Sequence, residues 1–368
     1  MTKIWYSIGV MSGTSLDGVD IAYVKFENTI LNGIDNWKFH ILFAKTYSYS
    51  DKWLNKLKDA FYYSKNDLEK IDLEYGEYLS KLINQFRKEK AITNVDFIAS
   101  HGHTIHHKPN EGYTLQIGNG KIIAKNTQIK TIYDFRTQDV NLGGQGAPLV
   151  PIGDKLLFSD YKYCLNLGGF ANISFNKIKD KTLEIIDKTL EVNRIAYDIC
   201  AVNTVMNHYV NKLGFEYDDK GNIAKSGKIN KDLLNKLNAL EFFKMDYPKS
   251  LGIEYVNDKL FPLIDSFKLD IKDILRTYIE HIAIQIINNL IDTGNLLITG
   301  GGTFNTFLID RIKELSSNDI VIPNEKVIDY KEALIFAFLG LLKLENKVNC
   351  LKSVTGASKN HSSGEIAI

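Results

Sequence analysis

The chain has little cysteine, little net charge and no long apolar run. Its cysteines, Cys164, Cys200 and Cys350, are odd in number and include no CxxC pair, which argues against a disulfide framework and a structural zinc site. A formal charge of +1 gives no electrostatic reason to expect nucleic acid or an anionic membrane as a partner. Polar residues interrupt the longest apolar stretch, near 282–291, and the N-terminus shows no signal-peptide pattern. We therefore expect a cytoplasmic protein that neither enters a membrane nor is secreted.

Two common phosphate-binding signatures are also missing. The sequence contains neither a Gly-x₄-Gly-Lys-Ser/Thr loop nor the His-Arg-Asp motif of protein kinases. Arginine is scarce as well, with five among 45 basic residues. An arginine kept in a loop suggests a need for the planar guanidinium group. Arg136, in Asp134-Phe-Arg136, is such a candidate, and the alternative is an ordinary surface charge.

The length of 368 residues favours two domains, because single hydrophobic cores rarely grow that large. The Gly- and Pro-rich stretch from Asn141 to Pro151 is too irregular for a helix or strand. We place the boundary there, with domains at 1–150 and 151–345 and a cleft between them. The tail, 346–368, is expected to pack back on the cleft or on the first domain.

The first of these domains opens with a hairpin whose turn suits phosphate. Residues 4–10 and 19–26 are rich in β-branched and aromatic residues, as strands are. Between them, Ser12-Gly-Thr-Ser15 offers backbone N–H groups and hydroxyls that an anion could approach closely. Asp17 and Asp20 follow, and carboxylates beside an anion make sense if Mg²⁺ lies between. An ordinary hairpin with a glycine-rich turn is an equally good interpretation of this segment alone.

The rest of the first domain alternates strands and helices. Apolar residues at intervals of three and four predict a helix over 67–89, after a shorter one at 50–63 and a strand at 39–47. Buried strands at 95–99 and 129–133 each end in polar residues, which is where α/β folds place their chemistry.

The second domain is predicted to repeat this opening. Residues 163–175 again predict strand, glycine-containing turn and strand, so two such hairpins could hold a polyphosphate from both sides. Residues 295–305 predict a buried strand that breaks into a glycine loop and then a helix, where a flat ring or phosphate could lie against backbone. A last helix, 331–344, carries Glu332 near its start.

These blocks resemble the anhydro-N-acetylmuramic acid kinases, a branch of the acetate and sugar kinase/Hsp70/actin superfamily. The similar segments follow the family's order and cover essentially the whole chain. They are Gly9-Val-Met-Ser-Gly-Thr-Ser-Leu-Asp-Gly-Val-Asp20, His101-Gly, Thr114-Leu-Gln-Ile-Gly118, Asp134-Phe-Arg136, Leu142-Gly-Gly-Gln-Gly-Ala-Pro-Leu-Val-Pro151, Asn166-Leu-Gly-Gly-Phe-Ala-Asn-Ile-Ser174, Pro248-Lys-Ser-Leu-Gly252 with Glu254-Tyr255, Gly300-Gly-Gly302 with Asn305, Glu332-Ala333, and Ser353-Val-Thr-Gly-Ala-Ser358.

The resemblance implies an α/β, duplicated two-domain actin-like ATPase (ribonuclease H-like) fold with an interdomain nucleotide cleft. It implies a kinase that uses ATP and Mg²⁺ to open 1,6-anhydro-N-acetylmuramic acid with water and to phosphorylate O6, giving N-acetylmuramic acid 6-phosphate. Such a role belongs to peptidoglycan recycling and amino-sugar metabolism. The resemblance also implies a homodimer whose ligands are a small sugar and ATP.

The family's site residues carry over to this sequence one by one. Asp198 takes the role of general base toward water, while Arg136, Glu332 and His101 fall on the sugar side. The second domain would add a phosphate turn at Gly168 and Gly169, and a loop approaching adenosine at Gly300, Gly301 and Gly302. Nucleotide phosphates, with Mg²⁺ held through water on Asp17 and Asp20, would lie on Gly13, Thr14, Ser15, Leu16, Asp17, Gly18, Val19 and Asp20.

The sequence departs from the family around the base. The family motif is Asp-Thr-Gly-Pro-(Gly or Ala)-Asn, whereas this chain has Asp198-Ile-Cys-Ala-Val-Asn203. If the motif's Gly-Pro segment begins a helix near the ligand, Ile199 and Val202 would narrow that approach. Cys200 has no neighbouring His in the sequence, so packing is a better interpretation than a nucleophile.

A second departure is the histidine run at residues 101–107. Imidazoles at short spacing suit Zn²⁺, but only His101 and His107 match the family pattern, so we interpret the run as a sugar-contacting loop. For His103 and His106 the alternative is simple surface exposure.

Two other functions stay open. One is a kinase of the same superfamily that acts on a different sugar. The other is a non-catalytic nucleotide-binding regulator, which the altered segment after Asp198 keeps possible.

Overall fold

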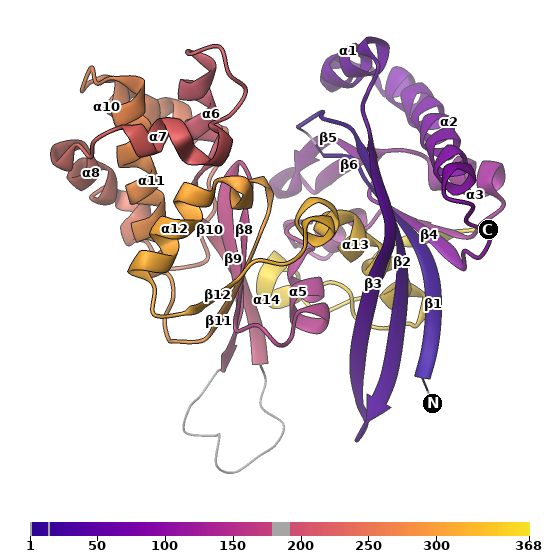
Figure 1. Ribbon diagram of the computed structural model, residues 1–368. Helices are drawn as coiled ribbons and strands as arrows, with labels where there is room; N and C mark the ends of the chain where they lie inside the picture. Colours follow the sequence, from indigo (N-terminus) through magenta and orange to yellow (C-terminus); the bar gives the residue numbers. More distant parts are fainter. Residues whose placement is uncertain (1, 14, 179–191) are drawn as a thin grey trace. The chain divides into compact units, whose positions relative to one another are not determined.

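The chain folds as two compact units in a computed structural model, which describes residues 2–13, 15–178 and 192–368. The first unit combines residues 1–157 with Tyr330–Ile368, and the second is Phe158–Asp329. Each unit has a mixed sheet with helices packed on it (Figure 1).

In the described part of the first unit, six strands form one sheet in the order β13-β7-β4-β1-β2-β3. The first three strands of the chain form an antiparallel meander, in which Met11 pairs with Asp20 on either side of the predicted phosphate turn. The next two, β4 and β7, run parallel to β1. The bounds are β1 Thr2–Met11, β2 Val19–Leu31, β3 Ile34–Tyr47, β4 Phe97–Ser100, β7 Thr131–Tyr133 and β13 Glu365–Ala367, with a separate hairpin of β5 His103–Lys108 and β6 Tyr113–Ile117.

The helices of this unit bury apolar faces against the sheet and one another. In α2 the buried positions include Ile71, Tyr75 and Phe86, as the intervals in the sequence predict. The side chain of Ser64 caps its start by accepting from the N–H of Asp67 at 3.3 Å. The helical segments are α1 Asp51–Asp59, η1 Ala60–Tyr62, α2 Lys65–Glu89, η2 Pro109–Glu111, α3 Gly120–Thr127, α4 Thr137–Asn141, α5 Pro151–Leu157, α13 Glu325–Leu344 and α14 Lys352–Thr355.

The second unit repeats the same topology. Its sheet has the order β10-β9-β8-β11-β12, again an antiparallel meander followed by two strands parallel to the first. The shared order confirms the internal duplication and the predicted α/β, duplicated two-domain fold. The strands are β8 Tyr163–Leu167, β9 Phe170–Ile178, β10 Val192–Ala201, β11 Asn295–Thr299 and β12 Asp319–Val321.

Helices of the second unit pack around α11, whose inward face is almost entirely buried. They supply a core separate from that of the first unit. Their bounds are α6 Asn203–Asn211, η3 Asp219–Gly221, α7 Asn222–Ser226, α8 Lys231–Asn238, η4 Glu241–Lys244, α9 Ile253–Tyr255, the π-helical η5 Val256–Leu260, α10 Phe261–Asp265, α11 Ile271–Asn288, η6 Gly301–Phe304 and α12 Thr306–Leu315.

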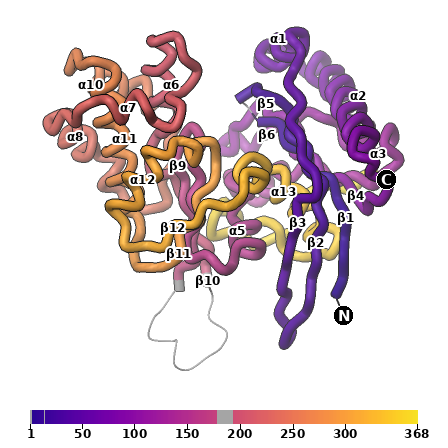
Figure 2. Tube along the Cα trace, in the orientation of Figure 1, coloured from indigo at the N-terminus to yellow at the C-terminus, as the bar shows by residue number. Residues whose placement is uncertain are grey.

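The division differs from the expected 1–150 and 151–345. The chain returns to the first unit at Tyr330, where α13 has a kink (φ −116°, ψ 16°). After the kink the helix lies so close to β1 that a Cβ on Gly9 would come within 2.0 Å of the Ala333 carbonyl oxygen. The tail stays with this unit, because β13 pairs antiparallel with β7; Figure 2 shows the C-terminus near α3 and β4.

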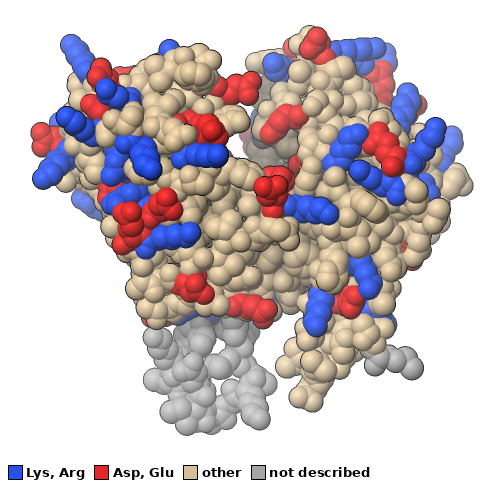
Figure 3. Space-filling model, viewed as in Figure 1, with Lys and Arg blue, Asp and Glu red and all other residues tan. Residues whose placement is uncertain are grey.

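No helix in the described residues is long and apolar enough to cross a membrane. On the face drawn in Figure 3, Lys and Arg lie interspersed with Asp and Glu.

The first core should depend strongly on the buried face of α2. We expect Phe86→Ala to lower the free energy of unfolding by about 3–5 kcal/mol, because Phe86 is fully buried and its loss leaves a cavity. Leu73, 47% exposed on the same helix, is the matched control, and Leu73→Ala should cost no more than about 0.5 kcal/mol. Urea denaturation followed by circular dichroism measures both changes, and equal costs would contradict this assignment of the core.

Candidate active site

The predicted sugar and phosphate residues of the first unit follow the ends of its parallel strands. The turn after β1 begins at Ser12, His101 directly follows β4, and Asp134 to Arg136 follow β7. Since β1, β4 and β7 are mutually parallel, their carboxyl ends lie at one edge of the sheet. The topology therefore gathers residues that are far apart in the sequence.

The phosphate turn is a tight connection between β1 and β2. Leu16 has a positive φ of 63°, and its N–H donates to the Gly13 carbonyl at 3.3 Å. Gly18 is required by close approach, since a Cβ there would lie 2.8 Å from the carbonyl oxygen of Tyr47. The Ser12 hydroxyl donates to Gly102 at 2.8 Å and ties the turn to the loop after β4. Thr14, a predicted phosphate contact, lies outside the described residues.

The two predicted metal carboxylates have different surroundings. Asp17 is exposed and accepts a hydrogen bond from the Ser15 hydroxyl. Asp20 is half-buried and accepts from the Thr46 hydroxyl at 2.5 Å. Both are close enough to Glu332 for their charges to raise the pKa of that side chain. Three carboxylates thus face one region of the first unit, which is a donor set suited to a hard cation.

Arg136 and His101 form a fixed pair. The Nδ1–H of His101 donates to the Gly102 carbonyl at 2.8 Å, so Nε2 carries the lone pair that accepts from Arg136 Nε at 3.0 Å. Burial and the neighbouring guanidinium lower the pKa of His101 well below its usual value, which keeps it neutral. Arg136 also donates from Nη1 to the Gly146 carbonyl at 2.6 Å. Arg136 is therefore not an ordinary surface charge.

Glu332 is the carboxylate nearest this pair on α13. It is exposed to solvent, yet dense protein around it raises its pKa, an effect that the charge of Arg136 opposes. The close contact of α13 with β1 at Gly9 places Glu332 beside the phosphate turn. Arg136, His101, Glu332 and the two aspartates are thus brought together within one unit.

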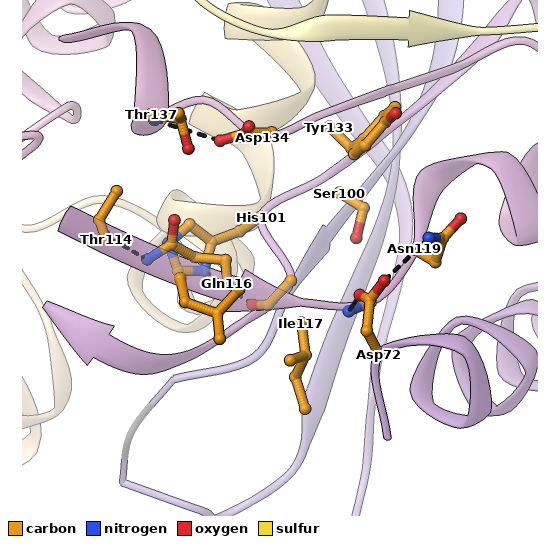
Figure 4. A pocket seen from close by; sticks show the side chains of 13 residues that line it. Asp72, Ser100, His101, Thr114, Gln116, Ile117, Asn119, Tyr133, Asp134 and Thr137 are labelled. Carbon is orange, nitrogen blue, oxygen red and sulfur yellow. Dashed lines mark hydrogen bonds between the residues drawn. The ribbon is translucent and has the colours of Figure 1, made fainter. Parts of the chain in front are cut away.

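A pocket opens beside this group (Figure 4). Its wall includes His101, Gln116 and Thr137, and at its other end Asp72 accepts from Asn119 Nδ2 at 2.8 Å. Thr137 N–H donates to Asp134, which explains how the turn after β7 holds its shape. Polar groups from several elements converge here, as in small-molecule sites. Asp72 gave no signal in the sequence, because its partner lies in a distant segment.

The histidine run is only partly as expected. His103 is 3% exposed and packs against Tyr75, and burial lowers its pKa to about 4, so surface exposure is wrong for this residue. His106 is half-buried against Phe61. His107 Nδ1 lies 3.1 Å from the hydroxyl of Thr114, a residue that lines the pocket.

In the second unit, the two predicted glycine segments meet at the carboxyl ends of parallel β8 and β11. Gly300 has φ 86°, and a Cβ there would lie 2.8 Å from the Leu167 carbonyl oxygen, immediately before Gly168. A Cβ on Gly169 would come within 2.7 Å of the Thr204 hydroxyl. Bare backbone is thus presented at the edge that corresponds to the phosphate turn of the first unit.

Asp198 lies on β10, at the irregularity where the register with β9 shifts. Its N–H donates to the Lys249 carbonyl at 3.2 Å, and its Oδ2 accepts from the N–H of Leu251 at 2.9 Å. Burial raises the pKa of this carboxyl above its ordinary value, and the bond from Leu251 partly offsets that rise. A half-buried carboxylate with raised proton affinity is well suited to act as a general base.

The residues that depart from the family motif follow Asp198 in the chain and are buried. Ile199, Cys200 and Val202 are fully buried in the core of the unit. The N–H of Val202 donates to the Gly169 carbonyl at 2.8 Å, which joins the start of α6 to the glycine turn. Burial raises the pKa of the Cys200 thiol, so packing is its role as expected.

Comparison with known proteins agrees with the resemblance in the sequence. A family model described as "Anhydro-N-acetylmuramic acid kinase" matches residues 5–368. The chain belongs to the anhydro-N-acetylmuramic acid kinase family. A member named for that activity from Shewanella denitrificans is 32% identical, over 98% of this chain and 97% of its own length. Another, from Coxiella burnetii, is 32% identical over 98% and 96%.

Solved structures resemble the chain only distantly. The activator of the 2-hydroxyisocaproyl-CoA dehydratase from Clostridium difficile is 11% identical and covers 92% of this chain and 97% of its own, with a TM-score of 0.39. Membership of the anhydro-N-acetylmuramic acid kinase family rests on the sequence matches, which span both units.

The raised pKa of Asp198 has a consequence for stability. A carboxyl whose pKa is higher in the folded chain favours folding when protonated, so stability falls as pH rises from the unfolded value, about 3.9, through the folded value. Asp198→Asn removes this cost and keeps an acceptor for Leu251. We expect the variant to melt at a higher temperature than the native chain at pH 7, with the difference shrinking toward pH 4. A variant that melts lower at pH 7 would contradict this view.

Proposed function

We propose that the protein is an ATP-dependent kinase that opens the 1,6-anhydro ring of 1,6-anhydro-N-acetylmuramic acid and phosphorylates O6. The observation that carries this proposal is the hydrogen bonding and the raised pKa of the Asp198 carboxyl. Leu251 binds its Oδ2, and within the described residues Oδ1 carries no hydrogen bond. Together with its raised pKa, this leaves a carboxylate oxygen ready to take a proton from water.

The chemistry balances with one base and one phosphoryl transfer. Water attacks the anomeric carbon as Asp198 takes its proton, and the bond from that carbon to O6 breaks. O6 then bonds to the γ-phosphorus of ATP as the bond from that phosphorus to ADP breaks, and Asp198 releases its proton to solvent. The products are N-acetylmuramic acid 6-phosphate and ADP. This couples hydrolysis and phosphorylation on one sugar.

The first unit would hold the sugar. Arg136 uses Nε and Nη1 to bind His101 and Gly146, and within the described residues Nη2 has no partner. A guanidinium fixed in this way can present its remaining donors to a sugar oxygen or carboxylate without losing much side-chain entropy. Glu332, whose raised pKa favours the protonated form more than usual, lies beside it.

The turns at Ser12–Gly18 and Gly168–Gly169 would hold ATP phosphates. The family implies Mg²⁺, and the residues fit, because Asp17, Asp20 and Glu332 offer carboxylate oxygens close to one another. When bound, the ion would neutralise charge on the transferring phosphoryl group. Asp17 and Asp20 would hold the ion, through bound water.

Asp198→Asn tests the base directly. General-base catalysis contributes roughly 10²–10⁴ in rate, so we expect turnover to fall by about 3–5 kcal/mol of barrier. Asp310→Asn is the matched control, since Asp310 is exposed on α12 of the same unit, and it should leave the rate unchanged. Steady-state ADP release measures both, and a near-normal rate in Asp198→Asn would remove Asp198 from this role.

The substrate is tested by the product. ADP release should require the anhydro sugar, and mass spectrometry should show that the sugar has gained both a water and a phosphoryl group. Phosphate gain without water would rule out the coupled reaction. Turnover only with a non-anhydro sugar would favour the second kinase hypothesis, and nucleotide binding without turnover would favour the regulator.

A cytoplasmic location, a role in peptidoglycan recycling and a homodimeric assembly also belong to this proposal. Each is implied by the resemblance, and sedimentation of the full chain tests the assembly.

A further inference from the structure

Three buried side chains of the first unit form a cluster that the proposed reaction does not use. They are Asp139 on α4, Cys350 and His361, with exposures of 0%, 2% and 5%. Cys350 and His361 face one another through an isolated antiparallel bridge near the C-terminus. Among the residues that the structure describes, this is the one group of His, Cys, Asp and Glu in which three potential ligand atoms all lie within 4.8 Å of one another.

The imidazole of His361 points Nε2 into this cluster, where the nitrogen makes no hydrogen bond. Its Nδ1–H donates to the Lys359 carbonyl at 3.2 Å, so Nε2 is the ring nitrogen left to meet a further ligand. Nε2 is buried without a hydrogen-bond partner and lies 3.5 Å from Asp139 Oδ1. A proton or a metal ion between these two buried atoms would satisfy both of them.

The spacing of the three atoms suits a metal ion. Ligands about 2.0–2.3 Å from a tetrahedral Zn²⁺ lie roughly 3.3–3.5 Å apart. Asp139 Oδ1 is 3.5 Å from His361 Nε2, within that range, and 3.0 Å from Cys350 Sγ, which is closer because the thiol hydrogen-bonds to the carboxylate. The hydroxyl of Thr355, 2.8 Å from the same carboxylate oxygen, borders the remaining side of the cluster.

The outer contacts are also those of a metal site. Histidine ligands usually donate their other ring N–H to a carbonyl, as His361 does to Lys359, and ligating carboxylates are themselves hydrogen-bonded. Asp139 meets this second condition, because its Oδ2 accepts from the N–H of Gly146 at 2.7 Å. These partners fix the orientation of both side chains before any ion binds.

We propose that Asp139, Cys350 and His361 bind one Zn²⁺-like divalent transition metal, with thiolate, imidazole and carboxylate as ligands. In the metal-free chain the Cys350 thiol donates a hydrogen bond to Asp139. When the metal binds, it takes the place of the thiol proton, and that proton is released to solvent. The sequence argued against structural zinc because no CxxC pair is present. The ligands come instead from segments 211 residues apart, which only the fold brings together.

The role of this metal is structural. It fastens the C-terminal segment to the loop that ends at Gly146, whose carbonyl accepts from Arg136. The same segment already contacts that loop through Gln145 N–H, which donates to Thr355 at 2.7 Å. Metal binding therefore fixes the loop whose Gly146 carbonyl accepts from Arg136. This inference does not depend on the reaction proposed above.

Metal binding by the full chain tests the proposal without an activity assay. The reduced protein is loaded with Zn²⁺, passed through a desalting column and analysed for metal, and a second sample is titrated with Co²⁺. We expect about one Zn²⁺ per chain, a thiolate-to-cobalt absorption band, and a higher melting temperature with Zn²⁺ than with chelator. Cys164→Ala, which removes a buried cysteine of the second unit, should keep all three results.

Ligand variants decide where the ion binds. Cys350→Ser should lose the cobalt band, and both Cys350→Ser and His361→Ala should weaken Zn²⁺ binding at least 10-fold, with the fold checked by circular dichroism. If neither variant folds, the native chain still decides. No retained Zn²⁺ and no cobalt band in the native chain, or a band that survives in Cys350→Ser, would overturn the proposal and leave the cluster as a hydrogen-bonded hub around Asp139.

Discussion

Parallel pairing of the first strand of each unit with the strand that follows the meander is the constraint on which the rest depends. It puts β1 beside β4 and β8 beside β11, so that the carboxyl ends of paired strands share an edge. At that edge the first unit carries the phosphate turn and His101, and the second carries its two glycine segments. A shift of this pairing would separate these groups even if every helix stayed intact.

The polar groups at these edges have pKa values shifted away from those that they have in water. His101 is kept neutral, and Arg136 is held by two bonds although burial lowers its pKa to about 10. Asp198 and Glu332 both have raised pKa values. Burial of Arg136, Asp198 and Glu332 disfavours their charged forms and so reduces stability at neutral pH, and functional sites are where proteins tolerate that cost. The raised pKa values thus support a catalytic use of these edges.

Much of the fold could be predicted from the sequence. The apolar intervals of α2, the strands on either side of the phosphate turn and the repeat at 163–175 depend on local patterns, which the chain displays openly. The return of the chain at Tyr330 depends instead on the contact of α13 with Gly9. A glycine in a strand gives no sign of which distant helix it faces, so the second boundary could not be placed.

The candidate site divides in the same way. Arg136 and His101 were recognised singly, through loop position and resemblance, but their hydrogen bond and the neutral tautomer require the fold. Asp72 and Asp139 belong to no motif that the sequence displays. Their importance comes from partners on remote segments, Asn119 for one and Cys350 for the other. Sequence patterns identify functional residues that belong to a local motif. They miss residues whose hydrogen-bond partners lie on distant segments that only the fold brings close.

The altered motif after Asp198 shows how a carboxyl can keep its position while the family's residues around it change. Asp198 is held by its N–H, which donates to the Lys249 carbonyl, and by its Oδ2, which accepts from the Leu251 N–H, and neither bond depends on the identity of the next four side chains. Ile199 and Val202 point into the core, so their size affects packing beneath the base rather than the space above it. Larger apolar residues there add buried surface that stabilises β10. Exchange of flexible residues for packed ones therefore leaves the Asp198 carboxyl in place, because both bonds that hold this residue come from backbone groups of Lys249 and Leu251.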